Sequence, residues 1–245
     1  EHLDGVALRT AEPALSDALV GGIHWLQPWT CIEPGELVQR YADLFVREGG
    51  DILRGDARSL RQSGAGWSVD TDSGSVGASQ VVVALGPWAH ELLGELGYRI
   101  PLFVKRGYHA HFADGATLSR PVLDTEQGYM LAPMKRGIRL STGAEFASLS
   151  APPTPVQLSK AERAARQVLA LGPQVERTPW SGARPCTVDM KPVIGAAPLH
   201  KGLWFNFGHA HQGFTLGPVS GRLLAELMMG EAPVVDPAPF APGRF

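Results

Sequence analysis

The sequence predicts a mixed fold of the α+β and α/β classes, in which helices and antiparallel strands share one chain. Amphipathic helical patterns, and short alternating apolar runs separated by glycine, proline and other turn residues, indicate this class. With 245 residues, of which 44% are hydrophobic, the chain is long enough to bury a core and to hold two subdomains.

Four segments carry helical patterns. The run EPGELVQRYADLFVREGG has Pro34 in its first turn and apolar residues on one face, and Gly49 ends it. The same periodicity predicts further helices over residues 87–97, 154–172 and 215–229.

Strand patterns fill most of the remaining chain. The runs DILRG, ARSLRQ, GWSVDTDSG and SVGASQVVVALG predict a small meander, in which residues 81–85 form a fully buried strand. Residues 100–112, 128–134 and 137–146 alternate apolar and polar side chains, and we expect them to form antiparallel strands.

Composition excludes several classes of protein. A formal charge of −2 and a pI near 6.5 give no basic footprint, so nucleic acid is not an expected partner. No apolar run approaches the roughly 18 residues of a membrane span, and the opening EHLDGVALRT does not resemble a secretory signal. We therefore expect a soluble, cytoplasmic protein. Two cysteines, Cys31 and Cys186, indicate neither a disulfide framework nor a zinc site.

The run NFGHAHQGFTLGPVSGRLLAELMMG places two histidines and several glycines before the last helix. His209 and His211 are two residues apart, so in an extended segment they point to opposite sides, which disfavours a metal site. Gly208 and Gly213 flank a tight connection into a helix whose first N–H groups are unpaired and attract negative charge. This arrangement favours a site where a large ligand lies against the backbone.

Within that last helix, small residues recur every four positions on one face, at Gly217, Gly221 and Ala225. The spacing is typical of a helix that packs closely on a neighbouring element, and it is equally typical of one that approaches a ligand. The pattern alone leaves both interpretations open.

Arg184, in the run WSGARPCTVDMKPVIG, is the most informative charged residue. It either pairs with a neighbour such as Asp189 or offers a planar, always-charged fork to a substrate carboxylate. Cys186 lacks the local signatures of a catalytic nucleophile and fits a small buried hydrophobe better. No G-x-S-x-G, G-x-G-x-x-G or G-x-x-x-x-G-K-[ST] occurs, so a complete dinucleotide-binding unit is not present.

Six stretches, in the same order, resemble the FAD-dependent D-amino-acid oxidase and dehydrogenase superfamily, which includes glycine oxidase. They are GGIHWLQPWTCIEPGELVQRYADLFVREGGDIL, QVVVALGPWAHELLGELG, PLFVKRGYHAHF, YMLAPMKRGIRLSTGAEF, WSGARPCTVDMKPVIG and GLWFNFGHAHQGFTLGPVSGRLLAEL. The last two are jointly the most specific. The family begins with a strand and a G-x-G-x-x-G helix that this chain lacks, so the chain looks like a fragment of the family's protein.

The resemblance implies a fold and a domain organisation. Residues 1–97 and 181–245 would form a partial FAD-binding domain, interleaved with an antiparallel-sheet substrate domain over residues 98–180. FAD would be the cofactor and a small amino acid the substrate.

The resemblance also implies roles near the substrate. Arg184 matches the arginine that binds the substrate carboxylate, and His211 matches a position whose side chain can face the substrate. Met130, beside Tyr129, falls where some relatives have a substrate-contacting tyrosine.

Cofactor contacts are implied at two places. Arg58 matches a backbone contact to the adenosine part, and Gly86 ends a strand that approaches the cofactor. The loop expected along the isoalloxazine and ribityl chain comprises Gly208, His209, Ala210, His211, Gln212, Gly213, Phe214 and Thr215.

The implied activity is oxidative deamination of D-amino acids, or of glycine or D-proline-type substrates, by hydride transfer to flavin N5. No strong acid or base is then required of the protein. For the complete protein the resemblance leaves room for peripheral contact with a membrane or an electron acceptor. The alternative is a truncated, non-catalytic remnant that binds a carboxylate ligand or a partner.

Overall fold

The computed structural model describes residues 1–245, and these form two compact units. The first unit comprises Glu1–Gln39, Arg106–Phe146 and Ser150–Gly182. The second comprises Arg40–Lys105, Ala147–Leu149 and Ala183–Phe245. The assignment of a substrate role or a cofactor role to predicted domains 1–97, 98–180 and 181–245 stays a prediction.

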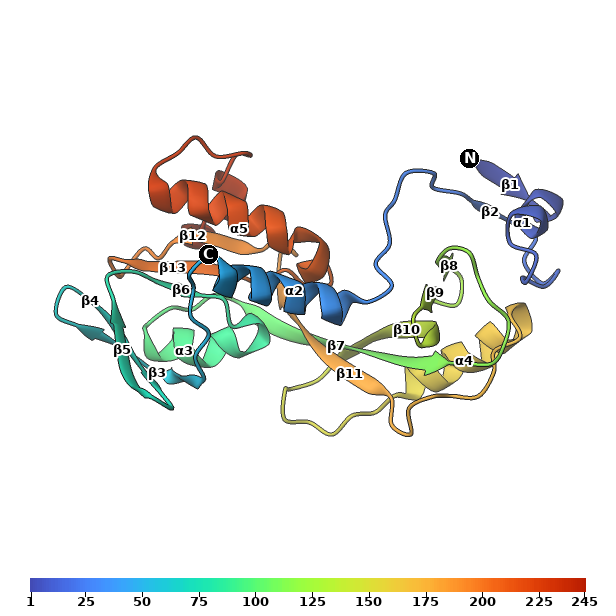
Figure 1. The fold of residues 1–245 in the computed structure, drawn as a ribbon, viewed down its shortest axis with the longest axis horizontal. Coiled ribbons are helices and arrows are strands. Elements are labelled where there is room, and N and C mark those ends of the chain that lie inside the picture. The colour runs from blue at the N-terminus through green and yellow to red at the C-terminus, as the bar shows by residue number, and fades with distance from the viewer. The chain divides into compact units, whose positions relative to one another are not determined.

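Helices and strands alternate irregularly along the chain (Figure 1). The α-helices are α1 (Gly5–Ala11), α2 (Pro34–Arg47), α3 (Ala89–Glu95), α4 (Val156–Val168) and α5 (Gly213–Met229), with 3₁₀ turns η1 (Gly86–Trp88), η2 (Ala238–Phe240) and η3 (Pro242–Arg244). The four predicted helical segments thus all contain helix, and the mixed fold class is confirmed.

Thirteen strands form four sheets. They are β1 (His2–Asp4), β2 (Gly21–Ile23), β3 (Gly55–Ser63), β4 (Gly66–Thr71), β5 (Gly74–Ala78), β6 (Val81–Val83), β7 (Leu102–Phe112), β8 (Val122–Asp124), β9 (Tyr129–Met134), β10 (Gly137–Phe146), β11 (Trp180–Thr187), β12 (Val193–Ala196) and β13 (Leu203–Phe207). The sheet orders are β1-β2, β11-β7-β10-β9-β8, β12-β13-β6 and β3-β4-β5.

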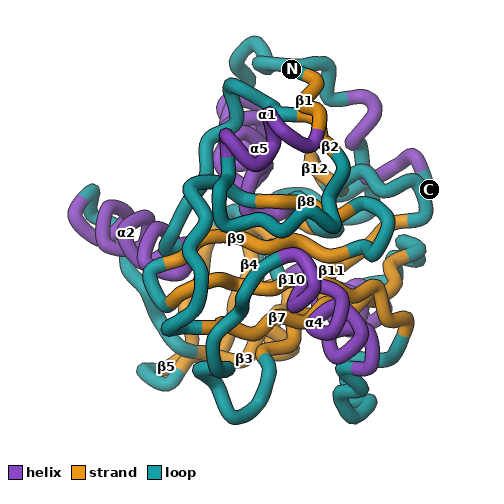
Figure 2. The backbone as a smooth tube through the Cα atoms, turned by 90° about the vertical axis from the view of Figure 1, so that its right-hand side faces the viewer, coloured by secondary structure: helices purple, strands orange, loops and turns teal.

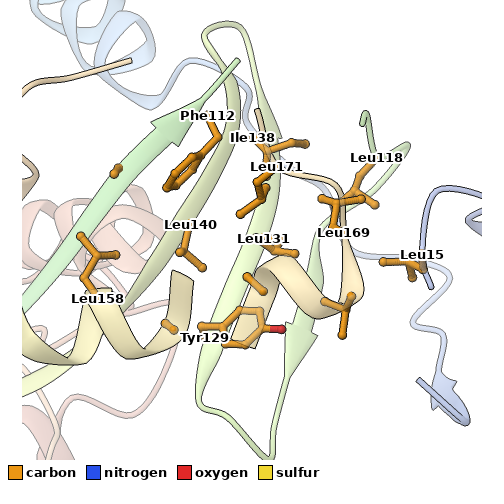
Figure 3. Packing of buried hydrophobic residues seen from close by; sticks show 14 of the residues in the cluster. Leu15, Phe112, Leu118, Tyr129, Leu131, Ile138, Leu140, Leu158, Leu169 and Leu171 are labelled. Atoms are coloured by element: carbon orange, nitrogen blue, oxygen red, sulfur yellow. The ribbon is translucent and has the colours of Figure 1, made fainter. Parts of the chain in front are cut away.

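The core of the first unit lies on one face of the five-stranded sheet, where α4 packs on β10 (Figure 2). Strands β9 and β10 pair antiparallel, as their alternating sequences predict. Tyr129, Leu131, Ile138 and Leu140 point from this pair into the core, together with Leu158 of α4 (Figure 3). Because side chains alternate along a strand, the residues between them face the other side of the sheet.

The second unit is built around the small sheet β12-β13-β6, on which α5 lies. Strand β13 runs antiparallel to β12 and parallel to β6. Phe205 and Phe207 of β13 are fully buried beside Val193 of β12, and Leu223 and Leu224 of α5 pack on Ile194 of β12. Only five residues separate the end of β13 at Phe207 from the start of α5 at Gly213.

Two predicted strands need correction. Residues 81–85 are not a fully buried strand, because β6 ends at Val83; Val83 is 3% exposed, whereas Val82 is 37% exposed. The reason is that β6 is an edge strand, paired with β13 alone. In the run DILRG, only Gly55 belongs to a strand, and residues 51–54 form a loop.

Helix α2 forms where its pattern predicts, but its apolar face is not covered. None of its residues is buried, and Tyr41, Leu44 and Phe45 all stay exposed. None of the helices has both the length and the apolarity that crossing a membrane requires.

Candidate active site

The end of β11 is tied to the loop that follows β13. An isolated antiparallel bridge joins Cys186 to His209, and the Ala210 N–H donates to the Pro185 carbonyl over 2.9 Å. These contacts are formed one and two residues after Arg184. Two segments that lie more than twenty residues apart in the sequence therefore meet beside the predicted carboxylate-binding arginine.

The backbone of this loop adopts left-handed conformations at two residues. Gly208 has φ +82°, and a Cβ there would stand 3.2 Å from Thr187 Cγ2, so glycine is needed for both conformation and space. Ala210 has φ +50°, which is unfavourable for a residue with a side chain. The bond from Ala210 to Pro185 holds this conformation, and the Gln212 N–H closes the turn on the His209 carbonyl at 2.9 Å.

The two histidines of the loop have different surroundings. His209 is partly buried, and its Nε2 lies 2.9 Å from Ser220 Oγ of α5. The Ser220 hydroxyl can donate to the Leu216 carbonyl at 2.8 Å, in which case Nε2–H donates to Ser220. Burial lowers the pKa of His209. His211 is exposed, which leaves its ring accessible to a ligand.

Helix α5 begins at Gly213 without a side-chain cap. Gln212 at the N-cap makes no side-chain hydrogen bond to the helix, and Gly213, Phe214 and Thr215 are all exposed. The first N–H groups of a helix have no partner within it, and the helix dipole adds partial positive charge there. The first turn is thus an open set of donors suited to a negatively polarised group.

The small-residue face of α5 is not packed on another element. A Cβ built on Gly217 or Gly221 would meet no atom within 4 Å, and Ala225 is exposed. Close packing on a neighbouring element therefore does not explain why small residues recur every four positions along α5.

Arg184 lies on β11 and is partly buried, and this burial lowers its pKa. An arginine nonetheless stays charged in proteins. Its suggested ion-pair partner is bound elsewhere: Asp189 accepts from Arg244 Nε at 2.9 Å and from the Lys191 N–H at 3.1 Å. The Arg244 hydrogen bond, as the largest influence, lowers the pKa of Asp189 to about 2.

Cys186, two residues further on, is fully buried, and burial raises the pKa of its thiol. A raised pKa opposes formation of the thiolate that a nucleophile needs. Cys186 therefore behaves as a small apolar residue, as its sequence context favours.

Arg58 and Gly86 lie on other elements of the second unit. The exposed Arg58 side chain pairs with Asp56 over 2.9 Å, and the Arg58 N–H donates to the same carboxylate at 3.0 Å. Gly86 has φ +55° and begins η1, three residues after β6 ends. Neither is in the loop after β13.

Tyr129 and Met130, in the first unit, point to opposite faces of β9. Tyr129 is 1% exposed within the core, where its hydroxyl has no hydrogen-bond partner, and burial together with the nearby Asp124 carboxylate raises its pKa. Met130 is 39% exposed on the other face. Of the two, only Met130 is open to a ligand.

The two best-defined hollows lie away from these residues. One, of about 190 Å³, is lined by Phe112, Leu118 and Ile138 among others; another, of about 430 Å³, follows the turn from Ala196 to Trp204. Hollow shape alone would not have found the candidate site, whose features are backbone donors and charge.

Sequence reasoning missed a polar cluster on the second face of the five-stranded sheet. His109 and His111 of β7 lie near Arg139 of β10 and near Glu176. Two histidines at alternate positions of one strand, His109 and His111 of β7, were the available signal.

Comparison with known proteins gives a consistent result. Residues 1–227 match the family model described as FAD dependent oxidoreductase. The chain is 29% identical over 253 residues to a D-amino-acid oxidase of Bradyrhizobium diazoefficiens, covering 100% of this chain and 59% of that protein. It is 31% identical over 265 residues to a D-amino acid dehydrogenase of Cereibacter sphaeroides, covering 100% and 58%.

A solved structure agrees with these relatives. Glycine oxidase from Geobacillus kaustophilus superposes with a TM-score of 0.80 at 23% identity, covering 100% of this chain and 67% of that one. The chain thus spans somewhat less than two thirds of the length of the curated relatives it matches. The relatives are amino-acid oxidoreductases, which favours an enzyme over a carboxylate-binding remnant.

Proposed function

Because the chain belongs to the FAD dependent oxidoreductase family, we propose that it supplies substrate- and flavin-binding parts of an enzyme that oxidatively deaminates D-amino acids or a related small amino acid such as glycine. The observation that carries the proposal is the junction of β11 with the loop before α5. There a partly buried arginine on β11 and an uncapped helix start belong to segments tied together by Cys186, His209 and the bond from Ala210 to Pro185.

The residues present fit the flavin part of the cofactor. The exposed first turn of α5, from Gly213 to Thr215, offers unpaired N–H donors. When bound, FAD accepts the hydride that the amino acid loses. The uncapped donors would stabilise the negative charge that develops on the ring edge facing them.

Arg184 would bind the substrate α-carboxylate with two parallel N–H···O bonds, which fixes the orientation of the α-carbon. Partial burial strengthens this interaction because less water competes for the guanidinium. The substrate amine must be unprotonated for its lone pair to assist the oxidation, and its proton can pass to water. No side chain of the loop has to act as a strong acid or base, which agrees with the lowered pKa of His209.

The test is Arg184→Lys in the FAD-loaded protein. Lysine keeps the charge but loses the fork, so KM for D-alanine or glycine is expected to rise about tenfold to a hundredfold, as loss of a charge-assisted bond of roughly 1.5–3 kcal/mol implies. Flavin content should change little. Arg244→Lys is the matched control, because Arg244 binds Asp189 instead, and it should lower the melting temperature without changing KM. An unchanged KM in Arg184→Lys would remove Arg184 from the site.

A further inference from the structure

The loop before α5 has a buried half and an exposed half. Gly208 and Ala210 are buried, whereas every residue from His211 to Thr215 is exposed. Only the exposed half can meet a cofactor, but its backbone continues directly from the buried half. Whatever fixes Gly208 and Ala210 therefore also sets the direction of the N–H groups that follow them.

The end of β11 runs alongside the buried half of the loop. The isolated bridge between Cys186 and His209 is antiparallel, so the next residues in register are Thr187 and Gly208. These two residues are in direct contact, because a Cβ built on Gly208 would stand 3.2 Å from Thr187 Cγ2. The methyl group of Thr187 therefore lies against the backbone of Gly208.

Hydrogen bonds fix the side chain of Thr187. It is fully buried, and its hydroxyl donates to the Lys191 carbonyl over 2.7 Å. The Met190 N–H donates back to the Thr187 carbonyl at 3.1 Å, in the connection that leads from β11 into β12. Because the hydroxyl bond fixes χ1, the methyl group on the same Cβ keeps one direction, toward Gly208. The two branches of the threonine thus have separate tasks.

A charged group also lies close to this hydroxyl. The Arg244 hydrogen bond, as the largest influence, lowers the pKa of Asp189 to about 2, and the Thr187 hydroxyl adds a smaller contribution. Arg244 Nη2 also donates to the Lys191 carbonyl, at 2.9 Å. Both acceptors near the hydroxyl therefore have another donor. A variant that lacks the hydroxyl leaves neither of them unpaired, and we expect it to fold.

We propose that Thr187 is a positioning residue for the cofactor. Its hydroxyl anchors the side chain to the connection between β11 and β12, and its methyl group seats Gly208, so that the exposed half of the loop presents its N–H groups to the flavin in one fixed direction. The inference rests on the proposed function, since it names a further residue of the same flavin-binding site. All of these residues belong to the second unit.

The first experiment measures hydrogen exchange of the loop amides without cofactor. Thr187→Ser keeps the hydroxyl and removes only the methyl group, and we expect the bonded Ala210 and Gln212 N–H groups to exchange about fivefold to tenfold faster. Thr71→Ser is the matched control, because the Thr71 hydroxyl likewise donates within its own turn, to the Gly74 carbonyl over 2.6 Å. The control should leave both rates unchanged. Unchanged rates in Thr187→Ser would overturn the proposal.

The second experiment titrates the same proteins with FAD and follows flavin fluorescence. The apparent Kd should rise about threefold to tenfold in Thr187→Ser, because the loop then adopts its binding conformation only part of the time. Thr187→Val keeps a methyl group toward Gly208 and should raise the Kd less. The reverse order would assign the effect to the hydroxyl and overturn the seating of Gly208.

This titration separates the inference from the proposed function. Equal FAD binding by wild type and Thr187→Ser overturns the inference and leaves the proposed function standing. If the wild type itself does not bind FAD, the proposed function falls, and the cofactor role of Thr187 falls with it.

A double-mutant cycle tests the contact itself. Gly208→Ala adds a Cβ 3.2 Å from the Thr187 methyl carbon, at a φ of +82° that strains any side chain. Thr187→Ser in the same protein makes room for this Cβ. The Kd of the double variant should therefore be at least about threefold lower than the product of the two single effects predicts. Independent effects would show that the two residues do not constrain each other, and would overturn the proposal.

Discussion

The loop before α5 and the second face of the β7–β10 sheet both prepare hydrogen-bond donors, but by different means. In the loop, the donors are backbone N–H groups, and their direction is set by left-handed residues at Gly208 and Ala210. On the sheet, the donor is the Arg139 side chain. Its direction is set by the partly buried series of hydrogen bonds that joins Glu176, His111 and Arg139. Backbone donors tolerate changes of side chain but depend on glycine, whereas side-chain donors depend on each bonded neighbour.

The strongest way to break the loop is Gly208→Val. A β-branched residue at φ +82° is strained by about 1–3 kcal/mol, and its Cβ would also press on Thr187 Cγ2. We expect the melting temperature to fall by about 5–10 °C, which scanning calorimetry would measure. Gly217→Ala is the control, because a Cβ there meets nothing within 4 Å and alanine favours the helix. Equal behaviour of the two variants would show that the loop conformation is not constrained as described.

The sheet cluster should respond to Glu176→Gln. The amide loses the charge that His111 and Arg136 donate to, and we expect a loss of about 1.5–3 kcal/mol in unfolding free energy, measured by urea denaturation at pH 7. Arg163→Gln, which removes an exposed charge on α4, is the control. If the loss of unfolding free energy were no larger than in the control, the hydrogen bonds from Glu176 through His111 to Arg139 would not hold the cluster together.

The pH dependence of this variant sharpens the comparison further. Burial raises the pKa of Glu176, but the hydrogen bonds from the His111 backbone and ring outweigh it, so the pKa lies below its ordinary value. A carboxylate with a lowered folded pKa stabilises the fold above its unfolded pKa of about 4.3, and this contribution is lost as the pH falls through the folded value. The stability difference between wild type and Glu176→Gln should therefore be constant from pH 6 to 7 and shrink below about pH 4.

The smallest effect is expected for Ser220→Ala in α5. It removes the contact with His209 Nε2, which is only partly buried, so water can replace the lost partner. We expect a loss of about 0.5–1.5 kcal/mol in unfolding free energy and no change in flavin content. A larger loss, or release of flavin, would show that the His209 side chain orients the loop. The backbone bonds of Ala210 and Gln212 would then not be sufficient to hold it.

Local patterns predicted those parts of the fold that are determined locally. Periodicity located α2, α4 and α5, and alternation located the antiparallel pair β9–β10. The first 23 residues escaped prediction, because α1 has only seven residues, Gly5–Ala11, too few for a periodic pattern to stand out. It is held by the Asp4 cap and by buried Glu12, which accepts from the Ser119 N–H at 3.0 Å, 107 residues away.

The sequence patterns did not predict the limits of the two compact units either. One boundary falls between Lys105 and Arg106 within β7, and another between Gly182 and Ala183 within β11. A continuous strand contains no run of linker-type residues, such as glycine, proline and serine, from which such a boundary could be predicted. Motif-like residues such as Arg184 and Gly208 could be singled out from sequence. The Arg139 cluster could not, because its bonds join residues 28 and 65 positions apart.

The unpaired side of β6 bears on how the protein can be handled. A strand with free N–H and C=O groups along one side is a template for another strand, and it invites chains to associate edge to edge at high concentration. The exposed apolar residues of α2, among them Tyr41 and Phe45, form a second surface at which chains can associate. Dilute samples, moderate salt and a lysine substituted for Val82 on the edge strand would therefore favour a monodisperse preparation.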